Sequence, residues 1–165
     1  MDIAWKPLNK EIQSAVHQAQ LPWLGTRYSS HQREIGGGVS CYGLVAEILD
    51  TLYRRDTPTE LPLINTNAGM CNDAGAGLVS SFLRGYPLDS VMEDIEPGDL
   101  VVTRSVPGLG GPSWMGHVMM AGARPGLAIH AMPATGVAWG SFVSSLGRIV
   151  RVYRPRDKES WIHVR

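Results

Sequence analysis

The stretch SCYGLVAEILDTLYR, residues 40–54, decides which fold the sequence predicts. Its apolar residues recur at helical spacing, so we predict a central helix over Ser40 to Arg54 that is buried on one side. The apolar stripe consists of Leu44, Val45, Ile48, Leu49 and Leu52. Ser40 is a suitable N-cap, which places Cys41 in the first turn. Unpaired amide groups and the helix dipole favour a thiolate there, so the helix start is a predicted site of thiol chemistry.

Helical and strand patterns are segregated along the chain. Leu8 to Gln20 is a predicted amphipathic helix, and Asp73 to Arg84 is a predicted third helix. The predicted strands are Asp99–Arg104, His117–Ala121, Leu127–Ala131, Gly136–Trp139 and Arg148–Arg154. Helices followed by strands indicate an α+β fold, with N-terminal helices packed on a central antiparallel sheet. The length of 165 residues favours a single domain, residues 1–165.

Charge and hydropathy exclude several classes of function. Fifteen basic and 15 acidic residues cancel, so the chain lacks the basic footprint of a nucleic-acid binder. No apolar stretch approaches the roughly 20 residues of a membrane helix. The start MDIAWKPLNKEIQSAV lacks the basic segment and apolar run of a Sec-type signal peptide. We therefore expect a chain made in the cytoplasm that reaches any other compartment by a signal-independent route.

The two cysteines differ in their surroundings. A disulfide between Cys41 and Cys71 is formally open, but two cysteines do not make a disulfide framework. The alternative for Cys41 is a small buried hydrophobe, the commonest state of a cysteine. Cys71 lies in a loop sequence without a following apolar helix, so we interpret it as incidental. The run Gly36-Gly37-Gly38 before Cys41 would let a substrate backbone approach closely, because glycine has no side chain to block it.

Two of the five histidines interrupt apolar strands. A polar residue there costs free energy unless it is paired or points into a site, so His117 and His130 are the candidate partners of the thiol. The other three lie on polar or terminal segments: His17, His31 and His163. If Gly122 pairs with Leu127 in a hairpin, His117 shares a face with His130 at a diagonal Cα separation of about 7–8 Å. His117 would then be the base, and His130 would orient its ring.

Taken together, these residues resemble the NlpC-type cell-wall cysteine peptidases, a family of the papain-like superfamily. The family's motifs occur in order over most of the chain, as Gly25-Thr26-Arg27-Tyr28, Gly36-Gly37-Gly38, Ser40-Cys41-Tyr42-Gly43-Leu44-Val45, Glu96-Pro97-Gly98-Asp99-Leu100-Val101, Gly116-His117-Val118, and Ile129-His130-Ala131 with Gly136-Val137 after it. The resemblance implies a papain-like, NlpC-type fold. It also implies a catalytic triad of Cys41, His117 and His130, with the backbone N–H of Cys41 helping to hold the oxyanion.

The resemblance implies that Tyr28 lines the site near the nucleophile. The expected substrate-binding residues are Tyr28, Gly38, Ser40, Tyr42 and Trp114. Ser40 replaces the family's acidic residue, which is associated with gripping the free amine of the peptidoglycan stem. Tyr42 replaces a small residue, and this aromatic side chain would reshape the pocket. The attack chemistry is therefore predicted more sharply than the substrate.

The resemblance predicts a hydrolase that cleaves an amide bond in peptidoglycan stem peptides, without a metal or another cofactor. We expect a monomer that acts in the periplasm or cell wall of a target cell. It would be an antibacterial effector injected by a contractile, type VI-like secretion machine, with an immunity or inhibitor protein as partner, or a phage-type lysin.

Three alternatives use the same residues differently. A papain-fold toxin or acyltransferase would act on a protein or lipid-like acyl substrate, with Tyr42, Trp114 and Trp139 lining a larger pocket. A non-catalytic module is disfavoured by the intact Cys, His and His set. A zinc site at the same three residues is disfavoured because a fourth ligand at a usual spacing is missing.

Overall fold

The computed structural model describes residues 4–60, 85–104, 116–141 and 149–162. The helices are α1 (Lys10–Gln20) and α2 (Cys41–Leu52), with 3-10 turns η1 (Leu21–Trp23) and η4 (Lys158–Trp161). The strands are β1 (Ala4–Trp5), β2 (Arg33–Glu34), β3 (Gly38–Val39), β4 (Leu88–Val91), β5 (Asp94–Ile95), β6 (Leu100–Arg104), β7 (Gly116–Ala121), β8 (Leu127–Met132), β9 (Gly136–Ser141) and β10 (Ile149–Pro155). The predicted helix Asp73–Arg84 lies outside the described residues.

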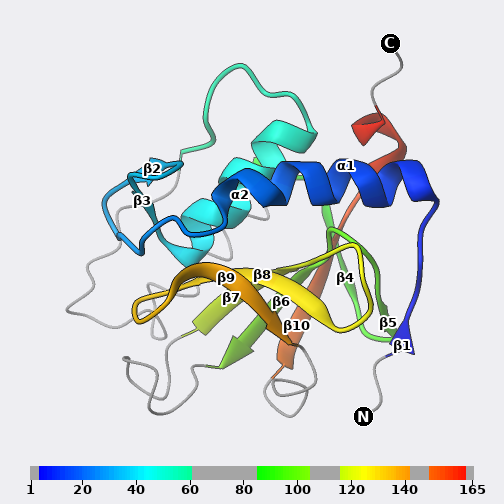
Figure 1. Cartoon of the computed structure of the whole chain (residues 1–165). Coiled ribbons are helices and arrows are strands. Elements are labelled where there is room, and N and C mark those ends of the chain that lie inside the picture. Colours follow the sequence, from blue (N-terminus) through cyan, green and yellow to red (C-terminus); the bar gives the residue numbers. More distant parts are fainter. Residues whose placement is uncertain (1–3, 61–84, 105–115, 142–148, 163–165) are drawn as a thin grey trace.

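A six-stranded antiparallel sheet forms the base of the fold. Its strand order is β4-β10-β6-β7-β8-β9, and α1 and α2 lie on the same side of it (Figure 1). The main core fills the space between these two layers and joins Ile12 and Val16 of α1, Leu44 and Ile48 of α2, and Met120 of β7. The structure thus confirms the predicted α+β fold, with N-terminal helices packed on an antiparallel sheet.

Capping side chains determine where both helices begin. Asn9 accepts a hydrogen bond from the Ile12 amide at 2.8 Å, so α1 starts at Lys10 rather than at Leu8. Ser40 Oγ accepts one from the Gly43 amide at 3.0 Å, which confirms the predicted cap and starts α2 at Cys41. These oxygens satisfy amides that have no partner within the helix.

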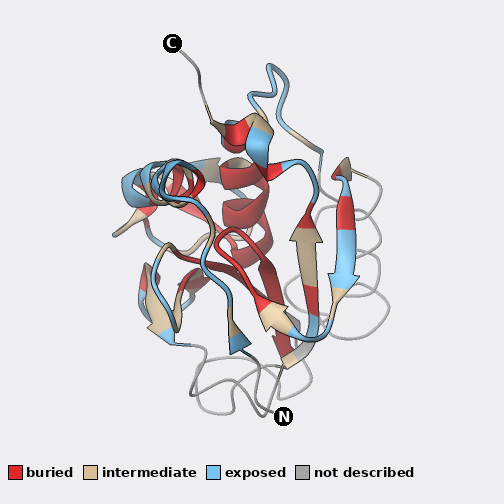
Figure 2. Cartoon of the chain, turned by 90° about the vertical axis from the view of Figure 1, so that its right-hand side faces the viewer, coloured by how far each residue is buried: buried red, intermediate tan, exposed pale blue. Residues whose placement is uncertain are grey.

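Helix α2 is buried almost all round, whereas the sequence predicted burial on one side. Figure 2 shows it buried along its length, in the middle of the molecule. The polar Asp50 tolerates this position because it accepts hydrogen bonds from the Tyr86 hydroxyl at 2.8 Å and the Thr59 amide at 2.9 Å. The sheet covers one side of α2 and α1 covers another, and the helical periodicity of the sequence shows only the first of these contacts.

The Pro97-Gly98-Asp99 turn before β6 is held by a buried ion-pair network. The Asp99 side chain is fully buried and lies 2.8 Å from both Lys158 Nζ and Arg154 Nη2. A Cβ on Gly98 would lie 2.7 Å from the Trp161 ring, so glycine is needed for this close approach. The turn therefore clamps the C-terminal η4 against the sheet.

Candidate functional site

The β7–β8 hairpin brings the two histidines together. Ala121 pairs with Ala128, and the Gly122 amide donates to Leu127 O at 2.8 Å, as the predicted register requires. His117 Nε2 lies 3.0 Å from His130 Nδ1, and the ring planes are inclined by 61°. The structure therefore confirms that the hairpin places the two rings in hydrogen-bonding contact.

The two strands pair only next to their turn. In the described part of the chain, the β7–β8 ladder consists of two residue pairs, Met120–Ile129 and Ala121–Ala128, whereas β8 and β9 pair at six positions. Beyond Met120 no further backbone pair joins the two strands in the described residues, and the imidazole pair connects them. The histidines therefore lie where the backbone ladder has ended and side chains make the contact between the two strands.

Burial keeps both imidazoles neutral. It lowers the pKa of His117 to about 3, with a smaller contribution from charge on His130, and it also lowers the pKa of His130. A neutral imidazole has one N–H donor and one acceptor nitrogen. If His117 donates through Nε2 to His130 Nδ1, its own Nδ1 is left as an acceptor. That is the protonation state required of a general base.

Cys41 occupies the first position of α2 and carries a thiol rather than a disulfide. It is 1% exposed, so the expectation of a buried position and the expectation of a helix-start position both hold. The capped first turn directs its unpaired amide groups towards this end of the helix. Cys71 lies outside the described residues.

Backbone hydrogen bonds connect the start of α2 to the histidine end of the sheet. Val39 at the end of β3 exchanges hydrogen bonds with the 27–29 segment, from its amide to Arg27 O and from the Ser29 amide to its carbonyl, both at 3.0 Å. The same segment continues to β9, where the Val137 amide donates to Thr26 O at 2.8 Å. Val137 in turn pairs with Ala131, the residue after His130. Helix α2 itself packs on β7 and β8, the strands that carry the histidines.

Tyr28 lies on this connecting segment. It forms a bridge with Val39 and packs against the main core. Burial, and next the negative charge of the Cys41 thiolate, raise the pKa of Tyr28 to about 12. The phenol is therefore neutral near pH 7 and lies within electrostatic reach of Cys41. A direct contact of Tyr28 with substrate stays a prediction.

The glycine run forms a turn of the polypeptide. Gly36 has φ +75° in the turn between β2 and β3, and a Cβ on Gly38 would lie 2.7 Å from Ser29 Cβ and from Gln32 Oε1. Packing against the segment that precedes the hairpin thus accounts for Gly38, and its expected role in substrate approach stays a prediction. The segment Trp23 to Val39, which the sequence predicted as a loop, contains this hairpin because the turn glycines permit it.

The remaining predicted site residues are in different environments. Ser40 is 7% exposed, and its hydroxyl caps α2. Tyr42 is 2% exposed and belongs to the main core, and its expected role in shaping the substrate pocket stays a prediction. Helix α2 is enclosed on several sides, which periodicity alone does not reveal. Trp114 lies outside the described residues. Trp139 is half-buried beside His17, with ring centroids 6.1 Å apart.

The sequence reasoning missed Gly140, a neighbour of His130. A Cβ at Gly140 would lie 2.9 Å from His130 Nε2. The available signal was a glycine inside a strand, since this often marks the close approach of another group.

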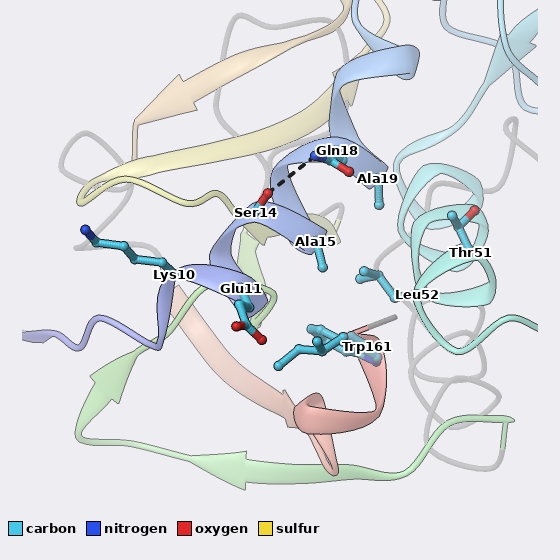
Figure 3. A pocket seen from close by; sticks show the side chains of 10 residues that line it. Lys10, Glu11, Ser14, Ala15, Gln18, Ala19, Thr51, Leu52 and Trp161 are labelled. Carbon is cyan, nitrogen blue, oxygen red and sulfur yellow. Dashed lines mark hydrogen bonds between the residues drawn. The ribbon is translucent and has the colours of Figure 1, made fainter. Parts of the chain in front are cut away.

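A groove of about 750 Å³ lies elsewhere, between α1, the end of α2 and η4 (Figure 3). Lys10, Glu11 and Gln18 contribute polar groups, while Leu52 and Trp161 contribute apolar surface. Leu52 and Cys41 are at opposite ends of α2, separated by about 16 Å at 1.5 Å per residue. The groove is therefore separate from the candidate site.

Within the described ranges, no group of three or more His, Cys, Asp or Glu side chains could hold a metal ion. No helix in the same ranges is long and apolar enough to cross a membrane.

Solved structures share this fold. A lipoprotein-like protein of the NLP/P60 family from Staphylococcus aureus subsp. aureus Mu50 is 16% identical, with a TM-score of 0.55 over 94% of this chain and 45% of that chain. The chain has the fold of the NLP/P60 proteins. Ly7917 is also 16% identical, with a TM-score of 0.53 over 87% of this chain and 62% of its own. Ly7917 with the hydrolyzing product of MDP gives 15% and 0.54 over the same shares.

These likenesses confirm the predicted NlpC-type fold. This chain spans less than half of the S. aureus protein and less than two thirds of Ly7917. No protein-family model matches the chain, and no curated protein matches it. The assignment of all 165 residues to one domain stays a prediction.

Proposed function

We propose that this chain is a cysteine hydrolase that cleaves an amide bond in peptidoglycan stem peptides. The observation that carries the proposal is the His117–His130 pair, whose ring nitrogens lie 3.0 Å apart. Backbone hydrogen bonds through the 26–29 segment connect the start of α2 to the part of the sheet that holds this pair. Cys41 begins that helix. A thiol at a helix N-terminus and a neutral imidazole supported by a second polar group are the parts that acyl transfer requires.

In the proposed reaction, His117 Nδ1 accepts the thiol proton while Cys41 Sγ attacks the amide carbonyl carbon. The backbone N–H of Cys41 donates a hydrogen bond to the oxyanion that forms. The C–N bond then breaks, and His117 returns the proton to the leaving amine. Water attacks the resulting thioester with His117 again as the base, which regenerates the thiol and releases the carboxylate. His130 holds the His117 ring through its Nδ1.

The substrate class is supported by the structural neighbours. One belongs to the NLP/P60 family, and Ly7917 has a structure with the hydrolyzing product of MDP. At this low sequence identity the structural likeness shows a shared fold and no more, so we extend the substrate class to this chain as a proposal. The delivery route, an immunity or inhibitor protein and the monomeric state likewise stay predictions from the sequence.

The experiment is digestion of purified peptidoglycan sacculi of several stem-peptide chemistries, with product identification by mass spectrometry. The wild-type protein should release peptide fragments with a new carboxyl and a new amine end, and Cys41→Ala should release none. A Cys71→Ala variant is the matched control and should match the wild type. Absence of products from every type of sacculus would overturn the proposed substrate.

A second candidate function is acyl transfer or hydrolysis on a protein or lipid-like acyl substrate. It is favoured by Ser40, because the NlpC-type peptidases have an acidic residue at the position that this neutral side chain occupies. The Ser40 hydroxyl is used to cap α2. A carboxylate that could bind a free amine is therefore absent at position 40. Ser40→Asp restores it, and it should increase cleavage of stem peptides with a free amine if the peptidoglycan assignment is right.

A further inference from the structure

Strand β9 passes directly behind the His130 ring. Ala138 pairs with His130, and Gly140 pairs with Ala128 two places along the same strands. A Cβ at Gly140 would lie 2.9 Å from His130 Nε2, 3.1 Å from Cε1 and 3.4 Å from Cδ2. A Cβ atom is not found this close to another heavy atom, so the imidazole can occupy its position only because Gly140 has no side chain.

We propose that Gly140 is a positioning residue, whose missing side chain lets His130 present Nδ1 to His117 while Nε2 faces strand β9. The catalytic consequence rests on the proposed function, whereas the positioning itself rests on the distances among these residues. Gly140 acts through His130 and has no contact with reacting atoms.

The tautomer of His130 depends on this space. A neutral His130 that accepts a hydrogen bond at Nδ1 carries its proton on Nε2. That N–H lies beside Gly140, so a methyl group at this position would collide with it. A ring displaced or turned to avoid the collision would no longer offer Nδ1 to His117 Nε2 at 3.0 Å.

The ring, rather than the strand, is the part that can move. Strand β9 pairs with β8 at six positions, and its Val137 also exchanges hydrogen bonds with Gly25 and Thr26. Among the residues that the structure describes, the His130 ring has one side-chain hydrogen bond, to His117, and it lies beyond the last backbone pair of β7 and β8. A side chain at Gly140 should therefore displace the ring and leave β9 in place.

The first test is steady-state hydrolysis of the peptidoglycan fragment that the wild type cleaves. Gly140→Ala should lower kcat about 100-fold, the size expected of a misplacement near 1 Å, with KM unchanged. Gly122→Ala is the matched control, because its Cβ would meet the Trp139 side chain rather than a histidine. It should stay within about threefold of the wild type.

A double-mutant cycle separates positioning from a general defect in the sheet. In a His130→Ala background the ring is gone, so Gly140→Ala should cause no further loss of kcat. An equal loss in both backgrounds would overturn the proposal.

A spectroscopic experiment tests the positioning of His130 without measuring activity. In a Cys41→Ala protein, nitrogen-15 NMR of the imidazoles should show His130 protonated at Nε2 and accepting at Nδ1. Adding Gly140→Ala should shift these signals, and unchanged signals would overturn the positioning role. If the wild type cleaves no peptidoglycan while the signals shift, the proposed substrate fails and the positioning inference stands.

Discussion

Replacing Ser40 by alanine should lower the free energy of unfolding by about 1–2 kcal/mol. The Ser40 hydroxyl accepts the Gly43 amide at 3.0 Å, and the residue is 7% exposed. Loss of an N-cap costs about 0.5–2 kcal/mol, and a buried amide left without a partner costs about 1–3 kcal/mol. The first turn of α2 is enclosed by the core, so water is poorly placed to replace the lost acceptor. These considerations place the effect in the upper half of the range for caps.

The assay is urea denaturation followed by tryptophan fluorescence, for which the buried Trp23 and Trp161 are the reporters. With a slope of about 2 kcal/mol per molar urea, the midpoint should fall by about 0.5–1 M. Ser40→Asp is the matched control, because aspartate caps as well as serine does and its charge is favourable at a helix N-terminus. A midpoint unchanged in Ser40→Ala, or lowered equally in Ser40→Asp, would refute the capping argument.

Three other predictions concern charge and backbone geometry. Because burial lowers the pKa of His117 to about 3, the unfolded chain takes up a proton below pH 6.5 that the folded chain does not. Stability should therefore fall as pH drops from 6.5 towards 3, and urea midpoints of His117→Gln should show a shallower fall. Gly136 has φ +68°, and Gly136→Ala would place a Cβ 2.5 Å from the Thr26 carbonyl oxygen. Calorimetry should therefore show that the free energy of unfolding falls by more than about 2 kcal/mol. The control Gly126→Ala should cost about 1 kcal/mol, because its Cβ meets open space. Asp99→Asn removes the buried carboxylate that Lys158 and Arg154 share, although Lys158 keeps Glu96 and Arg154 keeps Asp94, and should cost about 1–3 kcal/mol. Asp89→Asn, which breaks an exposed pair, should cost under about 1 kcal/mol.

The elements that the sequence predicted well are those with a local signal. Periodicity and a capping residue located α2 to within two residues at its C-terminal end, because both act within one helix. The β7–β8 hairpin followed from two apolar runs around Arg124-Pro125-Gly126. The contact of His117 with His130 then followed from the alternation of side chains along paired strands.

The features that the sequence did not predict depend on distant parts of the chain. Strand β4 is short and lies at the edge of the sheet, so its residues show no strong alternation. Burial of Tyr42 depends on the elements that enclose α2. The partners of Asp99 follow it by 55 and 59 residues, too far for any local pattern to connect them. Gly140 is separated from His130 by a turn. The close approach of the His130 ring to Gly140 arises from the pairing of β8 with β9, so it cannot be seen in the sequence around either residue.

The central claim is that Cys41 and His117 act as one unit in amide hydrolysis. The most direct measurement is kcat on a stem-peptide substrate for the wild type, Cys41→Ala, His117→Ala and the double variant. When two residues act together in one step, the losses of kcat caused by removing each of them do not multiply. The kcat of each single variant should therefore fall about 10³-fold or more, and the double variant should be no slower than either single variant. Losses that multiply in the double variant, or a Cys41→Ala protein that keeps more than about a tenth of wild-type kcat, would contradict the account.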